Sequence, residues 1–185
     1  AKDIIKNCRV CKNLESSVKK IDYLIATTSR FRNKNIKHIK LKDLNKIDYT
    51  NKVAFLFGSE ASGLSNNEIS YANYTLQIPT NPNFKSLNLS HSVIIIAQII
   101  ASIIKLKTSK YSMSKKVKLA KKKDIQVMAN FCIKKLEDKN FFKPLKKKPI
   151  MLENLRSIFY KMELSEKEIR ILSSVFANLS KKKVD

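Results

Sequence analysis

The chain has 185 residues, 43% of them hydrophobic, and its 38 basic residues outnumber 15 acidic ones, giving a formal net charge of +23. This hydrophobic content supports one folded domain with a small appendage and excludes wholesale disorder. The most apolar run, residues 93–104, is too short to cross a bilayer, so we expect no membrane span. We also expect no signal peptide, and three cysteines without a secretory context favour a cytoplasmic location.

Short apolar runs alternate with helical segments through the first 105 residues, which predicts an α/β domain with a parallel sheet. The expected strands are residues 8–11, 21–27, 53–57 and 74–78. The expected helices are residues 14–20, 66–71 and 86–105, and residues 33–50 have the composition of a loop rich in Asn and Lys. In such a sheet, ligands bind at the carboxyl ends of the strands.

Cys8 and Cys11 form a C-x-x-C pair near the amino end. A structural zinc site needs a second pair or nearby histidines, and a thioredoxin-like site needs a helix directly after the pair. The sequence offers neither, so we expect no metal site and interpret both cysteines as small apolar residues of a short strand.

The predicted helix over residues 86–105 is apolar nearly all round, because Ile94 and Ile95 add to a helical repeat of leucine, valine and isoleucine. Such a helix is buried on two sides. Burial within a single core is one explanation. A domain core on one side and a second subunit on the other is the alternative.

Residues 106–123 are rich in Ser and Lys, a composition typical of a linker, so we divide the chain into a domain over 1–105, this basic linker, and a helical module over 124–185. Ser165 and Glu168 form a capping box that opens the last helix of the module. The side chains expected to face inward from its three helices are Ile125, Met128, Cys132 and Leu136; Leu152, Leu155, Phe159 and Met162; and Ile169, Leu172, Phe176 and Leu179.

Two motifs follow predicted strands. One reads FGSEASGL over residues 57–64, and the other reads IPTNPNFKSLNL over residues 78–89. Both glycines of the chain, Gly58 and Gly63, lie in the first motif, which indicates a backbone requirement there.

With both motifs in this order, the chain resembles the SPOUT class of RNA methyltransferases, specifically the TrmH/TrmJ (SpoU) branch. Members of this branch transfer a methyl group from S-adenosylmethionine to a ribose 2′-hydroxyl. The helical extension is similar to that of TrmJ-like tRNA enzymes. The resemblance implies a parallel sheet with a C-terminal trefoil knot, S-adenosylmethionine without a metal, and a homodimer through the 86–105 helix.

The reaction implied by the resemblance is 2′-O-ribose methylation of tRNA in the anticodon loop. Two alternatives stay open. One is an rRNA 2′-O-ribose methyltransferase of the same class, and the other is a non-catalytic knotted RNA-binding relative.

Three loops build the cofactor site that the resemblance implies, and positioning the methyl group in line with the attacking oxygen is the chemistry they must provide. Ser86, Asn88 and Glu60 are the expected catalytic residues. The alternative interpretation of Ser86 and Asn88 is that they only cap the helix. The alternative for Glu60 is a loop carboxylate that is simply exposed to solvent. The expected cofactor-binding residues are Thr27, Thr28, Ser29, Gly58, Glu60, Ile78, Ser86, Leu87 and Asn88.

Lysines cluster between residues 105 and 148, where 16 of them stand against 3 acidic residues. Such clustering is typical of a surface that neutralises RNA phosphates. An anionic membrane surface is the alternative, but no continuous basic amphipathic helix with bulky aromatics is evident, so tRNA or rRNA is the expected partner. The expected RNA contacts are Arg30, Arg32, Lys115, Lys116, Lys121, Lys122 and Lys123.

Two departures from the family pattern stand out. Ser59 occupies a position where TrmJ-like members often have Arg. The family's first motif, an N-x-G-x-x-x-R-like segment with the usual catalytic Arg, has no match in this chain. We expect either that the N-terminal part of the catalytic domain is missing or that the protein is a degenerate relative. A first residue of Ala1 rather than Met favours the missing part.

Overall fold

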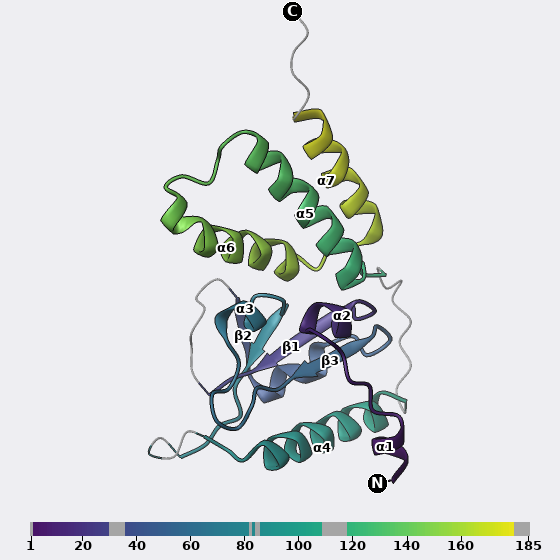
Figure 1. The fold of residues 1–185 in the computed structure, drawn as a ribbon. Coiled ribbons are helices and arrows are strands. Elements are labelled where there is room, and N and C mark those ends of the chain that lie inside the picture. Colours follow the sequence, from purple (N-terminus) through teal and green to yellow (C-terminus); the bar gives the residue numbers. More distant parts are fainter. Residues whose placement is uncertain (1, 30–35, 82, 84–85, 109–117, 180–185) are drawn as a thin grey trace, which may run out of the picture.

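The computed structural model describes residues 2–29, 36–81, 83, 86–108 and 118–179, and Figure 1 shows their arrangement. Within these residues the strands are β1 (Tyr23–Thr27), β2 (Lys37–Ile39), β3 (Val53–Leu56) and β4 (Tyr74–Leu76). The α-helices are α1 (Lys2–Lys6), α2 (Leu14–Val18), α3 (Asn66–Ile69), α4 (Leu89–Thr108), α5 (Lys122–Asp138), α6 (Lys148–Lys161) and α7 (Glu166–Leu179). Two 3-10 helices, η1 (Leu41–Lys46) and η2 (Leu145–Lys147), complete the set.

The four strands form a single parallel sheet in the order β2-β4-β1-β3. Strand β1 lies inside the sheet, with Ile25 opposite Phe55 of β3 on one side and Tyr74 of β4 on the other. All carboxyl ends of the strands therefore meet at one edge. The predicted α/β class and parallel sheet are confirmed.

Alternate side chains of β1 enter two different hydrophobic cores, because successive residues of a strand point to opposite faces of the sheet. Leu24 and Ala26 lie in the first core, and Ile25 lies in the second. All three are buried. The apolar run of β1 is thus continuous because helices cover both faces of the sheet (Figure 1).

The first core joins the sheet to the C-terminal helices. Ile125 and Met128 of α5 and Tyr160 of α6 belong to the same buried cluster as Leu24 and Ala26. Figure 1 shows α5, α6 and α7 on one side of the sheet and α4 on the other. The C-terminal helices therefore pack directly on the sheet and share its core.

Buried polar groups tie these two parts together. Asn73 accepts a hydrogen bond from the amide of Leu24 (2.9 Å) and donates one to the carbonyl of Tyr160 (2.9 Å). The Lys122 ammonium donates to the same carbonyl (3.3 Å), and the Lys122 amide donates to the carbonyl of Ile21 (2.8 Å). Asn73 and Lys122 are both about 1% exposed. The buried polar groups of Asn73 and Lys122 thus have hydrogen-bond partners across the junction.

The second core lies between the sheet and α4. Ile96 of α4 is buried against Ile25 and Leu76, while Ile99, Ile100 and Ile103 are partly buried beside them. On the outward side of α4, Ile94 is 63% exposed and Val93 is 42% exposed. One apolar side of this helix is therefore covered within the chain and another faces solvent.

Several predicted elements differ from the structure. Residues 8–11, all of them described, form no strand, and both cysteines there are exposed. The predicted loop over residues 33–50 contains β2 and η1, and the predicted helix starting at residue 86 begins at Leu89. Helix α5 begins at Lys122, so the expected linker extended too far.

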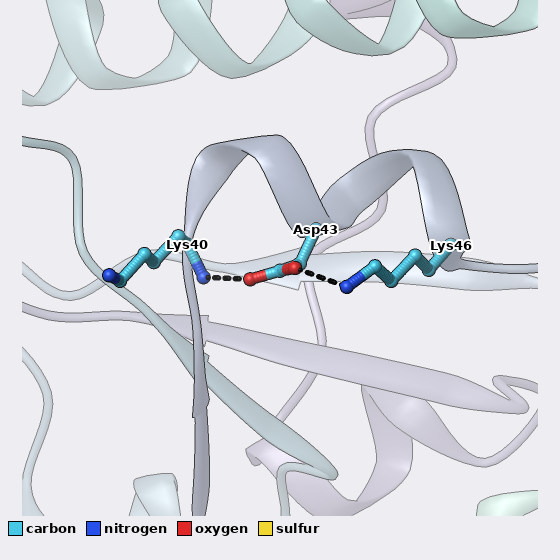
Figure 2. A network of polar contacts seen from close by, with 3 residues as sticks. All are labelled: Lys40, Asp43 and Lys46. Carbon is cyan, nitrogen blue, oxygen red and sulfur yellow. Dashed lines mark hydrogen bonds and ion pairs between the residues drawn. The ribbon is translucent and has the colours of Figure 1, made fainter.

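The 3-10 helix η1 shows why part of this loop is ordered. In Figure 2, Asp43 lies between Lys40 and Lys46. One Asp43 oxygen accepts from the Lys40 amide (3.0 Å) and the other accepts from the Lys46 ammonium (2.8 Å). These hydrogen bonds, the one from Lys46 foremost, lower the pKa of the Asp43 carboxyl. Together with Leu41, Leu44 and Ile47, which recur every three residues and pack in the second core, this local bonding fixes η1.

The C-terminal helices follow the predicted pattern closely. The capping box is confirmed, because the Ser165 amide donates to Glu168 (2.7 Å) and the Glu168 amide donates to the Ser165 hydroxyl (3.3 Å). Met162 and Leu179 were expected to face inward and are instead 46% and 71% exposed, because both lie at helix ends beyond the packed core. None of the described helices has the length and hydropathy that a bilayer span requires.

Candidate active site

The carboxyl end of β1 is bonded to both neighbouring strands. The Thr27 hydroxyl donates to the carbonyl of Leu56 in β3 (2.9 Å), and the Thr28 amide donates to the carbonyl of Leu76 in β4 (3.0 Å). The Gln77 side chain then donates to the Ser29 carbonyl (3.2 Å). These bonds hold residues 27–29 at the edge of the sheet where ligands of parallel sheets bind.

The loop after β3 folds tightly back on itself. The Gly63 amide donates to the Ser59 carbonyl (2.9 Å), and the hydroxyls of Ser59 and Ser62 lie 2.8 Å apart. Gly63 has a φ of +67°, which glycine adopts without strain. A Cβ at Gly58 would lie 2.1 Å from the Gly63 carbonyl carbon. The backbone requirement expected at the two glycines is thus explained by this close approach and this positive φ.

Glu60 connects that loop to the start of α4. Its Oε1 accepts one hydrogen bond from the Asn88 side-chain amide (2.8 Å) and one from the Leu89 backbone amide (3.2 Å). A carboxylate at this position satisfies an N-terminal amide of a 20-residue helix and interacts favourably with its dipole. Glu60 is exposed, as the solvated-carboxylate interpretation predicts, and its carboxylate is also bound to the start of α4.

Asn88 has two partners besides Glu60. Its Oδ1 accepts from the Ser90 amide (2.9 Å), which is a capping bond at the beginning of α4. Its backbone carbonyl accepts from the Ser92 hydroxyl (3.1 Å). The capping interpretation of Asn88 is thus correct, and the same side chain also orients the carboxylate of Glu60.

A cavity of about 350 Å³ lies between the loops that follow β1 and β3 and the start of α4. A smaller cavity of about 70 Å³ adjoins it and is lined in part by Ile78. Among the expected cofactor-binding residues, Thr27, Thr28, Ser29, Gly58, Glu60, Ser86 and Leu87 line the larger cavity. Asn88 is not among the described residues that line either cavity, and it lies behind Glu60 instead. The structure therefore gathers nearly all of the expected cofactor site in one place.

Some lining residues were not anticipated from the sequence. Ser92 lines both cavities, Ser62 lines the larger, and Thr80 lines the smaller. Ser92 follows Leu89, which also lines the larger cavity, by three residues, so the helical period could have placed it on the same face. No group of three or more potential metal ligands gathers among the described residues.

The expected RNA contacts divide into three sets. Arg30, Arg32, Lys115 and Lys116 lie outside the described residues. Lys121 and Lys123 are exposed, and the Lys123 amide donates to the Lys19 carbonyl (3.3 Å), so they adjoin the exposed Lys19 and Lys20. These four lysines form a basic seam between α2 and α5.

Lys122 was expected to contact RNA, and the structure shows that this expectation is wrong. It is 1% exposed, and its ammonium lies 5.0 Å from the centre of the Tyr160 ring. Burial lowers its pKa to about 7, and nearby Asp22 opposes the shift. A lysine held inside the core does not reach an RNA phosphate, so its role is structural.

Comparison with known proteins agrees with this geometry. The sequence profile of the SpoU rRNA Methylase family matches residues 1–98. The tRNA (cytidine-2′-O-)-methyltransferase TrmJ of Sulfolobus acidocaldarius is 38% identical over 96 residues, which are 50% of this chain and 41% of that protein. The tRNA (cytidine/uridine-2′-O-)-methyltransferase TrmJ of Photorhabdus laumondii is 24% identical over 186 residues, which are 98% of this chain and 77% of that protein.

Among solved structures, the crystal structure of TrmJ from Z. mobilis ZM4 superposes with a TM-score of 0.85 at 24% identity. The match covers 97% of this chain and 77% of that one, so the two share a fold. The present chain spans less than half the length of several curated relatives that it matches. Since the family profile matches more than half of its residues, the chain belongs to the SpoU rRNA Methylase family.

Proposed function

We propose that this chain carries the S-adenosylmethionine-binding part of a tRNA 2′-O-ribose methyltransferase. Family membership supports methyl transfer to RNA, and the names of the TrmJ relatives support tRNA as the substrate and the ribose 2′-hydroxyl as the acceptor. The observation that carries the proposal is the cavity that the loops after β1, β3 and β4 and the start of α4 line at the carboxyl edge of the sheet.

The residues around this cavity fit the cofactor. Its volume of about 350 Å³ lies within the usual range for sites that hold small molecules. Gly58, Ser59 and Ser86 have small side chains, which leaves backbone N–H and C=O groups within reach of an adenine edge. The negative charge of Glu60 at the cavity favours a cationic ligand. S-adenosylmethionine is such a cation, and its positively charged sulfur carries the activated methyl group.

Different roles follow for the three expected catalytic residues. Ser86 lines the cavity, so in our proposal its hydroxyl contacts the cofactor or the target ribose. Asn88 and Glu60 hold the loop after β3 against α4 through their mutual hydrogen bond. Their role in the proposal is to position the site, and positioning supplies much of the rate enhancement in a transfer reaction.

The proposal extends to the assembly and to the path of the chain. A homodimer through residues 86–105 is supported by the apolar outward side of α4, and a cytoplasmic location is supported by tRNA as the substrate. A trefoil knot is the arrangement expected of the family. RNA contacts at Lys121 and Lys123 are supported by their exposure and by the neighbouring Lys19 and Lys20.

The test is an assay of the full-length gene product with S-adenosylmethionine and with unmodified tRNA and rRNA, followed by mass spectrometry of the nucleosides. We expect new 2′-O-methyl nucleosides in the tRNA. Product in rRNA alone would replace the proposal with the rRNA alternative. Absence of product from both, with RNA binding intact, would favour a non-catalytic RNA-binding relative.

Asn88→Ala tests the site directly. Removing the amide deletes one of the two hydrogen bonds that Glu60 accepts at the start of α4, together with the capping bond to Ser90. We expect turnover to fall about a hundredfold, as for other losses of positioning. Asn178→Ala is the matched control, because the Asn178 side chain donates to the carbonyl of Ser174 within α7, away from the cavity. Circular dichroism establishes that both variants are folded. Equal turnover in the two variants would remove Asn88 from the site.

A further inference from the structure

The turn between α5 and α6, residues 139–147, presents an aromatic ring to solvent among lysines. Phe141 is 54% exposed, whereas its neighbour Phe142 is 4% exposed. The four lysines of this turn are Lys139, Lys143, Lys146 and Lys147, and all of them are exposed. Since large aromatic side chains are usually buried, a half-exposed phenyl ring within a basic turn calls for an explanation.

The backbone before Phe141 is fixed by the end of α5. The Asn140 amide donates to the carbonyl of Glu137 (2.9 Å), and the Phe141 amide donates to the carbonyl of Leu136 (3.0 Å). Asn140 has a φ of +53°, as expected for the left-handed residue that ends a helix. In such endings the next residue commonly packs its side chain back on the helix. Here Phe141 holds that position and remains half-exposed.

The ring itself is supported on one side. It packs edge-on against Phe142, with ring centres 5.3 Å apart and planes at 85°. Phe142 is buried, and the Lys148 ammonium lies 5.9 Å from its ring centre while pairing with Glu137 (2.8 Å). The Phe141 ring is therefore held in place, with little conformational freedom to lose when a flat partner stacks on its face.

We propose that this turn is a docking point for an unpaired base of an RNA strand. The Phe141 ring stacks on the base, and the exposed lysines contact the flanking phosphates. Stacking on an aromatic side chain beside basic residues is the usual way in which proteins hold single-stranded RNA. The inference rests on the proposed function, and it extends the RNA contact to a part of the chain outside the methylase domain.

In Figure 1 the turn between α5 and α6 lies at the upper left and the beginning of α4 at the lower left, on opposite sides of the sheet. The turn is therefore an RNA contact separate from the one proposed at the cavity. An anionic membrane also attracts lysines and exposed apolar side chains, but the membership of this chain in an RNA methylase family favours RNA.

A single-tryptophan variant tests the inference, because the chain has no tryptophan of its own. We expect single-stranded RNA to quench the indole fluorescence of Phe141→Trp, because the indole stacks on a base. A duplex of the same length should quench it much less. Ile171→Trp is the matched control, since Ile171 of α7 is also about half-exposed, at 52%, and we expect no quenching there.

Affinity for unmodified tRNA provides the second measurement. We expect Phe141→Ala to weaken binding about tenfold and Phe141→Trp to retain it, as for other stacking residues. Thermal unfolding should shift by only a few degrees in Phe141→Ala, because the half-exposed ring loses its edge-on contact with Phe142. Equal tRNA binding by wild type and Phe141→Ala would overturn this inference and leave the proposed function standing.

Two further outcomes separate the alternatives. If wild type binds no RNA, the proposed function fails together with this inference. If vesicles of anionic phospholipid shift the fluorescence of Phe141→Trp and RNA does not, the turn is a membrane contact and the inference is wrong.

Discussion

Glu60 shows how one side chain organises a site that three segments of the chain build. It lies 28 residues before Asn88, yet its carboxylate accepts from both the Asn88 side chain and the first amide of α4. The loop after β3 and the start of α4 are therefore joined by one carboxyl group. The first amides of a helix have no hydrogen-bond partner within the helix. The Glu60 carboxylate accepts from one of them and also lines the cavity beside it.

Glu60→Ala should weaken S-adenosylmethionine binding about tenfold, or about 1.4 kcal/mol, because the cavity loses the negative charge that favours a cationic ligand. Isothermal titration calorimetry of the purified protein measures the effect. Glu166→Ala is the control, since Glu166 forms an exposed ion pair with Lys118 away from the cavity. Unchanged affinity in Glu60→Ala would show that the carboxylate serves the helix alone.

The two glycines have different reasons to be glycine. A Cβ at Gly58 would overlap the backbone of Gly63 and Leu64, whereas a Cβ at Gly63 meets nothing within 4 Å. Gly63 instead needs its positive φ. One substitution creates a collision that the backbone must relieve, and the other places a side chain in an unfavourable backbone conformation.

We predict that Gly58→Ala lowers the free energy of unfolding by about 3 kcal/mol, as expected for severe overpacking. Gly63→Ala should cost about 1 kcal/mol, the typical penalty for a left-handed conformation. Urea denaturation of both variants gives the two values. Equal losses, or a larger loss at Gly63, would contradict the loop geometry described above.

At the scale of elements, α5 begins with a lysine inside the core. The Lys122 amide and ammonium both bond to carbonyls across the junction between the sheet and the C-terminal helices. Burial lowers the pKa of this group from its ordinary 10.5 to about 7. The folded protein therefore binds the proton on Lys122 less tightly than the unfolded chain does.

The free energy of unfolding should therefore rise with pH between about 7 and 10, where the unfolded state binds more protons at Lys122 than the folded state does. The slope from this group reaches about 1.4 kcal/mol per pH unit. Burial raises the pKa of Tyr23 and Tyr160, whose ionisation in the unfolded chain opposes the trend at higher pH. The measurement therefore stays below pH 10.

Lys122→Met isolates this contribution, because it keeps the length of the side chain and removes its charge. Urea denaturation at several pH values should give a flatter profile for this variant and an unchanged profile for Lys121→Met, whose side chain is exposed. A wild-type profile without a rise, or a Lys122→Met profile with the same rise, would show that Lys122 keeps its proton in the core.

For the whole molecule, the outward side of α4 is the main apolar surface that remains uncovered beside the site. Val93, Ile94 and Ile104 are exposed there, on a helix whose other side packs on the sheet. Because α4 also begins at the cavity, a second subunit against this side would lie next to the proposed cofactor site.

Ile94→Asp should convert the proposed homodimer to a monomer, because it would bury an unpaired charge in the interface. Analytical ultracentrifugation of the wild type and the variant reports the change. Ile158→Asp serves as the control, since Ile158 is an exposed apolar residue of α6 on the opposite side of the sheet. A monomeric wild type at all concentrations would contradict the proposal.

Much of this protein could be predicted from its sequence because the signals are local. Apolar runs predicted strands β1, β3 and β4, which the structure contains. The capping box predicted at Ser165 is confirmed by its hydrogen bonds with Glu168. The two motifs contain most of the residues around the cavities, since each motif follows a strand whose carboxyl end forms the edge of the site, while Thr27, Thr28 and Ser29 come from the loop after β1. Local pattern and site coincide because short loops keep their residues near the strand ends.

Other features depend on contacts between residues far apart in the chain, and the sequence does not display these. Lys122 resembled its exposed neighbours Lys121 and Lys123, yet its backbone pairs with Ile21 and its side chain lies against Tyr160. The three-residue strand β2 is stabilised by pairing with β4 rather than by any apolar repeat of its own. The sequence by itself thus determined the fold class, the family motifs and the carboxyl-edge location of the site. Only the tertiary structure decided which lysine is buried, how Glu60 and Asn88 meet, and that the C-terminal helices complete the core, because long-range packing alone sets those contacts.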